Sequence, residues 1–221
     1  MQDLVRQEQF EIEVLEYLNR KRFLDKIVFG GGTMIRLCYG LDRFSADLDF
    51  WITKKLDTAK LFGEIKNYLS QNYTLTDAQN KYYTMLFELK SKDYPRRLKI
   101  EIRKEKKTIE TEKAIAYSQF ANSQILLTTV ALDEMMKSKI EAFLERKEIR
   151  DVYDIEFLFK RRISLPEDKQ ILQQLLKTID GLGKKDYSVK LGSIIPAELR
   201  KYYTAENFKI LKLAIAEKIN H

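Results

Sequence analysis

Three consecutive glycines, Gly30–Gly32, restrict what this chain can fold into more than any other feature. The chain of 221 residues contains only 8 glycines, so the run does not reflect composition. The preceding run KIVF, at 26–29, is rich in β-branched and aromatic side chains and predicts a short strand. Thr33 is placed to cap a helix of about two turns that ends at Gly40. We therefore predict a strand, a tight glycine turn and a short helix in succession.

A second predicted strand carries two aspartates on one face. Residues 45–52 alternate between apolar and polar side chains. Leu48 and Phe50 fall on one face of this strand, and Asp47 and Asp49 fall on the other. The first face suits a core, and the second presents both carboxylates together.

The glycine turn and the aspartate pair have complementary chemistry. Glycines at the start of a helix allow a phosphate to approach the unpaired backbone N–H groups, which makes Gly31, Gly32 and Thr33 candidate phosphate-binding residues. Turn glycines also serve purely steric needs, and an Asp-x-Asp pair is common on protein surfaces. Two carboxylates on one strand face can share Mg²⁺ or Mn²⁺. In this order, the motif places a phosphate site beside a metal site, which nucleotidyl transfer requires.

Composition excludes several other classes of site. Cys38 is the single cysteine and His221 is the single histidine, so internal disulfides, histidine triads and Cys/His zinc sites are excluded. The formal net charge of +7 favours polyanions such as RNA or nucleoside triphosphates, although a surplus of this size also occurs without any function. The amino-terminal residues alternate charged and apolar side chains, which predicts a cytoplasmic protein with no membrane partner.

The rest of the chain predicts a mixed α/β first half and a helical second half. Strands are expected at 73–78, 82–90 and 97–104, after helices at 3–22 and 57–70. We assign residues 1–110 to an α/β domain with a mixed sheet flanked by helices. Residues 111–221 are assigned to a helical domain, which is expected to complete the active-site cleft.

Two more ionisable residues stand out by their position. On the predicted helix 131–147, Lys139 lies within a stripe of apolar residues, where it needs a charge partner or a functional role unless it extends to the edge of the stripe. Glu101 points away from the apolar face of the strand at 97–104. By position alone it can be an ordinary glutamate of the sheet surface.

The segment Gly-Gly-Thr at 31–33, followed by RFSADLDF at 43–50, resembles the DNA polymerase β-type nucleotidyltransferase superfamily. Within it, the sequence is most similar to the AbiEii/AbiGii-type toxin nucleotidyltransferases, which include the MenT toxins. Lys139 and the segment RDVYD at 150–154 resemble a second motif of that family. The resemblance covers residues 27–160.

The resemblance implies a role for each matching residue. Asp47 and Asp49 would hold the metal, and Lys139 and Asp151 would complete the catalytic set. Enzymes of this type often carry a third carboxylate, usually Asp, on a neighbouring strand, where it can help to deprotonate the attacking hydroxyl; only Glu101 matches it here. Arg43 and Ser45 match the family's R-x-S and would contact phosphate. Asp154 and Arg36 are further candidates, for which helical ion pairs with residues such as Arg150 or Lys147, or a solvated helix face, are the structural alternatives.

The resemblance also implies the partners: a nucleoside triphosphate, the 3′ end of tRNA as acceptor, and a cognate antitoxin. An acceptor hydroxyl on a small molecule or a protein is the alternative within the superfamily. A non-catalytic module that binds RNA or protein is the alternative outside it. Basic and aromatic residues interleave at 81–90, 94–107 and 199–209, a mixture that suits an RNA surface but also ordinary packing.

Overall fold

The computed structural model describes residues 2–105 and 108–220, which form two compact units. Of the described residues, 2–40, 44–105 and 108–131 form the first unit, and 41–43 and 132–220 form the second. The segment Leu41–Arg43 therefore packs with the second unit, although it lies between two elements of the first. Among the described residues, no helix is both long enough and apolar enough to span a membrane.

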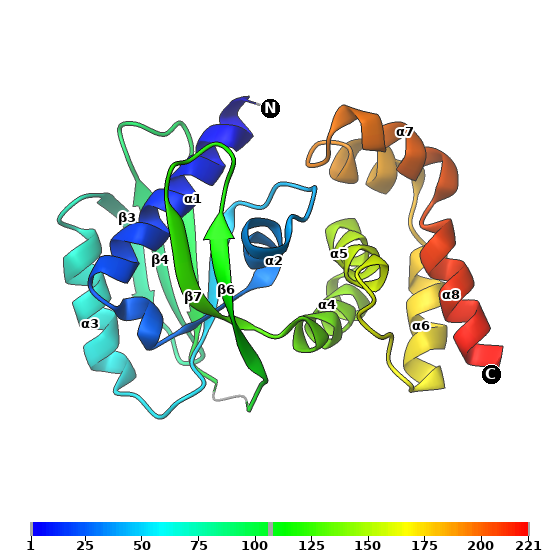
Figure 1. Ribbon diagram of the computed structural model, residues 1–221, viewed down its shortest axis with the longest axis horizontal. Coiled ribbons are helices and arrows are strands. Elements are labelled where there is room, and N and C mark those ends of the chain that lie inside the picture. Colours follow the sequence, from blue (N-terminus) through cyan, green and yellow to red (C-terminus); the bar gives the residue numbers. More distant parts are fainter. Residues whose placement is uncertain (1, 106–107, 221) are drawn as a thin grey trace. The chain divides into compact units, whose positions relative to one another are not determined.

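The first unit is a mixed α/β structure built on a seven-stranded sheet. Its helices are α1 (Gln2–Arg20), the short 3₁₀ helix η1 (Phe23–Asp25), α2 (Gly31–Tyr39) and α3 (Thr58–Leu69). Its strands are β1 (Val28–Gly30), β2 (Asp47–Trp51), β3 (Thr74–Asn80), β4 (Thr84–Lys90), β5 (Leu98–Arg103), β6 (Thr111–Tyr117) and β7 (Gln124–Val130). Figure 1 shows α1 running across the strands of this sheet.

The strand order is β3-β4-β5-β2-β1-β7-β6. Strand β2 pairs in parallel with β5, and β1 pairs in parallel with β7, while all other neighbours are antiparallel. The central strands alternate as the sequence predicts. One face of β2, β4 and β5 is fully buried; it carries Leu48, Phe50, Met85, Phe87, Leu89, Leu98, Ile100 and Ile102. The mixed sheet flanked by helices is confirmed.

The second unit is helical and begins later than predicted. Its elements are α4 (Leu132–Arg146), α5 (Ile149–Lys160), α6 (Lys169–Asp180), the π-helical segment η2 (Asp186–Leu191), α7 (Ala197–Glu206) and α8 (Lys209–Asn220). Residues 111–130 instead form β6 and β7, the second of which pairs with β1. Asn207 and Phe208 adopt positive φ angles of 49° and 58°, which separate α7 from α8.

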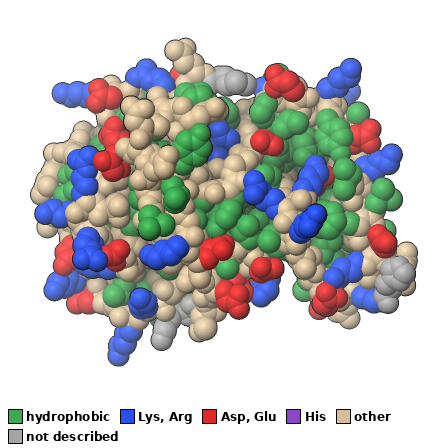
Figure 2. All heavy atoms as spheres, viewed as in Figure 1, with side chains coloured by type: hydrophobic (Ala, Val, Ile, Leu, Met, Phe, Trp, Pro, Cys, Tyr) green, Lys and Arg blue, Asp and Glu red, His purple; other side chains and the backbone are tan. Residues whose placement is uncertain are grey.

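Charged side chains of both signs are interspersed on the face of the molecule drawn in Figure 2. The formal net charge of +7 is a small difference between 40 basic and 33 acidic residues. Net charge alone therefore does not locate a surface for a polyanion, and such a surface has to be argued from particular residues.

Helix α1 places an unusual pair of carboxylates inside the first unit. Glu8 is buried and accepts a hydrogen bond from the Ser118 hydroxyl, and its other oxygen pairs with Arg36 of α2. Glu11 is fully buried, and neither of its carboxylate oxygens has a hydrogen-bond partner among the described residues. Burial and the charges of Glu8 and Asp47 raise the pKa of Glu11 well above its ordinary value of 4.5, and Arg36 offsets this only in part.

We predict that the Glu11→Gln protein is less sensitive to rising pH than the wild type. The raised pKa in the folded state means that Glu11 stabilises the fold most below its unfolded pKa and loses that contribution as pH rises toward its folded pKa. Urea unfolding at several values from pH 5 to 8 should show the variant gaining stability relative to wild type, by up to about 1.4 kcal/mol per pH unit. The exposed Glu141, changed to Gln, is the control. A difference between Glu11→Gln and wild type that is constant with pH would contradict the prediction.

Candidate active site

The glycine turn brings the start of α2 against the side chains of β2. Strand β1 ends at Gly30, and α2 begins at Gly31 with a φ of +76°. A Cβ atom on Gly31 would lie 2.3 Å from Oδ2 of Asp49, and one on Gly30 would lie 1.3 Å from a ring carbon of Trp51. Both positions therefore require glycine, the first also because of its positive φ. Gly32 is buried in the first turn of α2.

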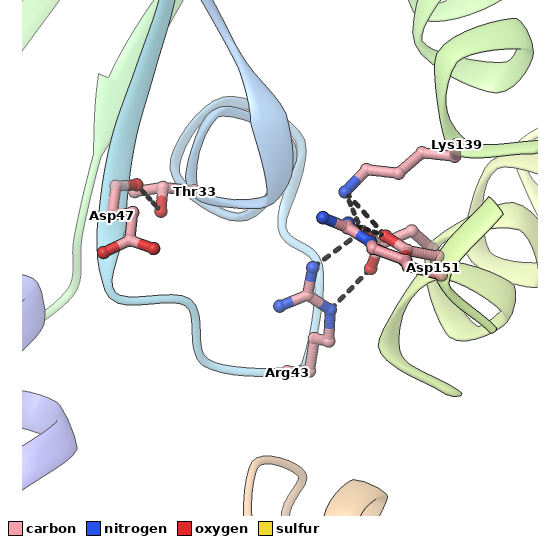
Figure 3. Close-up of polar contacts among 7 residues, drawn as sticks. Thr33, Arg43, Asp47, Lys139 and Asp151 are labelled. Atoms are coloured by element: carbon pink, nitrogen blue, oxygen red, sulfur yellow. Dashed lines mark hydrogen bonds and ion pairs between the residues drawn. The ribbon is translucent and has the colours of Figure 1, made fainter. Parts of the chain in front are cut away.

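Asp47 and Asp49 lie on the same side of β2 and are both half-buried. Asp49 is paired in register with Gly30 on one side and with Glu101 of β5 on the other. The Thr33 hydroxyl donates a 2.6 Å hydrogen bond to the backbone carbonyl of Asp47, as Figure 3 shows. Thr33 is thus not the cap of α2, as predicted, but a buried residue of its first turn that fixes the start of β2.

Glu101 shares the polar face of the sheet with the aspartates. Its carboxylate accepts a 2.8 Å hydrogen bond from the Lys99 ammonium. Burial disfavours the charged form of Lys99, but the hydrogen bond to Glu101 and the charges of Glu101, Asp47 and Asp49 outweigh it and raise the Lys99 pKa. The electrostatic potential at this face is therefore negative.

A divalent cation fits this face as a partly protein-bound ion. Among residues 2–105 and 108–220, no group of three or more His, Cys, Asp or Glu side chains is placed to hold a metal. Asp47 and Asp49 remain as two carboxylates on one strand face. Mg²⁺ is commonly bound by one or two carboxylates and completes its shell with water and substrate phosphates. The chemistry of the donor set thus suits Mg²⁺ or Mn²⁺ delivered with a nucleotide.

The other candidates of the first unit differ in their surroundings. Ser45 is half-buried in the segment before β2. Arg36 lies on α2, where it pairs with Glu8 and its guanidinium stacks over the Phe44 ring at 4.0 Å from the centroid. These contacts hold α2 against α1, which is a structural role for Arg36.

In the second unit, Asp154 is the centre of a buried ion-pair network. Arg43 donates two hydrogen bonds of 2.6 Å to its two carboxylate oxygens, and the Lys139 ammonium lies 2.6 Å from Oδ2 (Figure 3). Burial alone would raise the pKa of Asp154, but the charges of Arg43 and Lys139 and their hydrogen bonds lower it. The lysine that the sequence places in an apolar stripe has partners, as expected for a buried cation.

Asp151 belongs to the same network. Arg146 donates two hydrogen bonds of 2.6 Å to the carboxylate of Asp151, and the Lys139 ammonium lies 3.6 Å from Oδ1. The partners of the two aspartates are thus Arg43, Lys139 and Arg146, rather than the helical neighbours Arg150 or Lys147. Three cations face two carboxylates in this cluster.

The structure thus divides the predicted site residues between the two units. Gly31, Gly32, Thr33, Asp47 and Asp49 come together around the start of α2 and β2, with Glu101 beside them. Arg43, Lys139, Asp151 and Asp154 come together in the second unit. The idea that the helical half completes the cleft concerns both units together and stays a prediction.

Two charged residues near these clusters were missed from the sequence. Arg146 lies after the apolar stripe of α4, among several charged residues typical of a protein surface. Only its separation of five residues from Asp151 indicates that the two could pair. Glu11 sits one turn after Glu8 on a helix with many charges, so periodicity alone does not identify it as buried.

Comparison with known proteins agrees with this arrangement. The family model described as "Nucleotidyl transferase AbiEii toxin, Type IV TA system" matches residues 13–216. The crystal structure of JHP933 from Helicobacter pylori has a TM-score of 0.59 at 23% identity, over 96% of this chain and 93% of that one. A Helicobacter pylori protein described as a candidate nucleotidyltransferase has the same TM-score and identity, over 96% of each chain. At this identity, both show the fold. The sequence has no significant match among curated proteins.

The match at 13–216 includes both units and every candidate residue described above. It decides against a non-catalytic binding module and implies a nucleotide substrate and an antitoxin. The chain therefore belongs to the AbiEii toxin family and is a nucleotidyltransferase of a toxin–antitoxin system.

Proposed function

We propose that this toxin uses Mg²⁺ or Mn²⁺ to transfer a nucleoside monophosphate from a nucleoside triphosphate to an acceptor hydroxyl, with the tRNA 3′ end as the acceptor. The observation that carries the proposal is the placement of Asp47 and Asp49 on one face of β2, directly against the start of α2. Asp47 and Asp49 would hold the metal ion. The bound metal would neutralise charge on the phosphates as the transferred group moves.

The reaction forms a bond between the acceptor oxygen and the α-phosphorus and breaks the α–β phosphoanhydride, so that pyrophosphate leaves. The acceptor hydroxyl must also lose its proton. Glu101 is the carboxylate on β5 that pairs in register with Asp49, which makes it our candidate to accept this proton. Its ion pair with Lys99 limits how freely the carboxylate moves.

The start of α2 is the proposed phosphate site. Its first turn contains Gly31, Gly32 and Thr33, and the N–H groups of a first helical turn have no intrahelical partner. Since the Gly31 position has no room for a side chain next to Asp49, backbone donors and a metal-binding carboxylate lie side by side there. The proposed phosphate contacts of Ser45 and Arg43 rest only on the resemblance to the family motif. In the structure, the Arg43 guanidinium is held by Asp154.

Lys139 and Asp151 are proposed as the contribution of the second unit. The Lys139 ammonium is held between the carboxylates of Asp151 and Asp154, which fixes the position of a cation that could neutralise phosphate charge. Transfer to tRNA, with NTPs as donors, would take place in the cytoplasm.

We predict that Asp47→Asn and Asp49→Asn each abolish transfer, because each removes one of the two charges offered to the metal. Wild-type protein incubated with labelled NTPs, Mg²⁺ and total RNA should label tRNA, and each variant should label it at least about 100-fold more slowly. Asp25→Asn, which alters an exposed pair with Arg22, is the matched control and should label normally. If the label migrates with protein or with small metabolites, the acceptor is a protein or a small molecule and not tRNA. No label on any acceptor, from a folded wild type, would refute the proposal.

A second prediction separates catalysis from folding in the network around Asp154. In the Lys139→Met protein, Asp154 keeps Arg43 and Asp151 keeps Arg146, so the free energy of unfolding should fall by only about 1–3 kcal/mol. Transfer should nevertheless fall by about 100-fold or more if the ammonium acts on the phosphates. Lys137→Met, on the exposed side of the same helix, should change neither quantity. Normal transfer by folded Lys139→Met protein would leave Lys139 with a structural role only.

A further inference from the structure

The turn between β3 and β4 exposes two tyrosines. Tyr82 is 84% exposed and Tyr83 is 67% exposed, which makes them the two most exposed of the large hydrophobic side chains in the described part of the chain. Their rings contact each other edge to face, with centroids 4.6 Å apart at 85°. Exposing two adjacent aromatic rings to water is unfavourable, and the contact between the rings does not offset this. Exposed apolar groups that lie together are typical of binding surfaces.

This turn is firmly braced against β5. The Lys81 N–H donates to the Thr84 carbonyl at 2.8 Å, and the Lys104 N–H donates to the Tyr83 carbonyl at 2.8 Å. The Lys104 ammonium also donates to the carbonyl of Lys81. Because the backbone is already fixed, a ligand that stacks on the rings does not have to order this segment first.

The same end of the sheet is strongly basic. Residues 51–55, 80–84 and 103–105 together contain five basic residues and one acidic residue, Glu105. Register places them together, since Arg103 pairs with both Trp51 and Thr84. We call this surface the tyrosine patch; it consists of Lys54, Lys55, Lys81, Tyr82, Tyr83 and Arg103, all of them exposed.

The tyrosine patch lies close to the candidate catalytic carboxylates in the same unit. Trp51 follows Asp49 by two residues on the same face of β2, and Arg103 follows Glu101 in the same way on β5. Two residues of strand measure about 6.6 Å and neighbouring strands lie about 4.8 Å apart. The Arg103 guanidinium stacks over the Trp51 ring at 5.6 Å from its centroid. The patch thus continues the polar face that bears Asp49.

Other basic and aromatic stretches of the chain are used for packing. Tyr94 stacks on Phe10 with centroids 4.6 Å apart and donates to Glu13. Tyr203 is buried and packs against Tyr153 and Phe208. Lys106 and Lys107 of the stretch 94–107 lie outside the described residues. The stretch at 81–90 differs because it offers its aromatic faces to solvent.

We infer that the tyrosine patch binds the unpaired end of a single-stranded RNA, with bases stacked on Tyr82 and Tyr83 and phosphates neutralised by Lys54, Lys55, Lys81 and Arg103. Exposed aromatic rings beside cations are the combination that single strands use, whereas a duplex hides the faces of its bases. The inference rests on the proposed function in taking this RNA end as the acceptor.

Binding of a fluorescently labelled, unstructured RNA of about 10 nucleotides, followed by anisotropy without NTP, tests this inference. The Tyr82→Ala/Tyr83→Ala protein should bind about 5- to 150-fold more weakly for each stacked base that is lost. Tyr82→Phe/Tyr83→Phe should bind like wild type, because a phenyl ring still stacks. Tyr117→Ala, on β6, is the matched control, since Tyr117 is also exposed, at 52%. Lys54→Gln/Lys55→Gln should lower the slope of log affinity against log salt by about 1.4.

Two results would overturn the inference: wild-type affinity in Tyr82→Ala/Tyr83→Ala, or equal competition by duplex RNA or by an acidic peptide. Its failure is distinguishable from failure of the proposed function. Asp47→Asn/Asp49→Asn protein should bind the RNA normally without transferring a nucleotide. Transfer to RNA that is unchanged in the alanine variant, with the same KM for RNA, would discard the patch and keep the reaction. RNA binding that depends on the tyrosines, without any nucleotide transfer by the wild type, would keep the patch and refute the proposed reaction.

Discussion

The close approach of α2 to β2 is the contact on which the rest of the site depends. A side chain at Gly31 would overlap the carboxylate of Asp49, and a side chain at Gly30 would overlap the ring of Trp51. The lack of side chains there lets the helix start lie beside the aspartates. It also leaves Trp51 where Arg103 can stack on it, at the border of the tyrosine patch. One pair of glycines therefore determines the surroundings of both the proposed metal ligands and the basic surface beyond them.

Buried carboxylates of this protein are compensated to different degrees. In the second unit, each buried aspartate has a bidentate arginine, so neither carboxylate is left without compensation. In the first unit, Glu8 is paired with Arg36, but Glu11 has no hydrogen-bond partner among the described residues, and burial raises its pKa, which favours the neutral form. A neutral acid at this position adds no further negative charge behind Asp47. This matters because the polar face of β2 and β5 already carries several carboxylates.

Local patterns in the sequence predicted the parts of the fold that depend on local chemistry. The strand before Gly30, the alternation around Asp47 and Asp49, and the apolar stripe that contains Lys139 are each visible within a dozen residues. Contacts between distant segments were not predictable in this way. Arg43 bonds Asp154 across 111 residues, which the phosphate role inferred from R-x-S does not suggest. Thr33 looked like a cap because of its residue type, but its hydroxyl donates to the Asp47 carbonyl, 14 residues away. The domain boundary predicted at residue 110 assigns β6 and β7 to the helical half, although β7 pairs with β1.

The charges on the polar face of the first unit bear on how a nucleotide can enter. Asp47, Asp49 and Glu101 are opposed there by Lys99, whose raised pKa reflects the surrounding negative charge despite its burial. A bare triphosphate would be repelled by these carboxylates, whereas a divalent cation would be attracted. On the proposed function, the triphosphate therefore enters with a divalent cation already bound to its phosphates. Asp47 and Asp49 attract this same cation. The basic residues near Trp51 have the opposite preference. They favour the phosphates of an RNA strand that carries no metal ion. On this proposal, the negative part of β2 and β5 attracts the metal-bound triphosphate, and the basic part attracts the acceptor RNA.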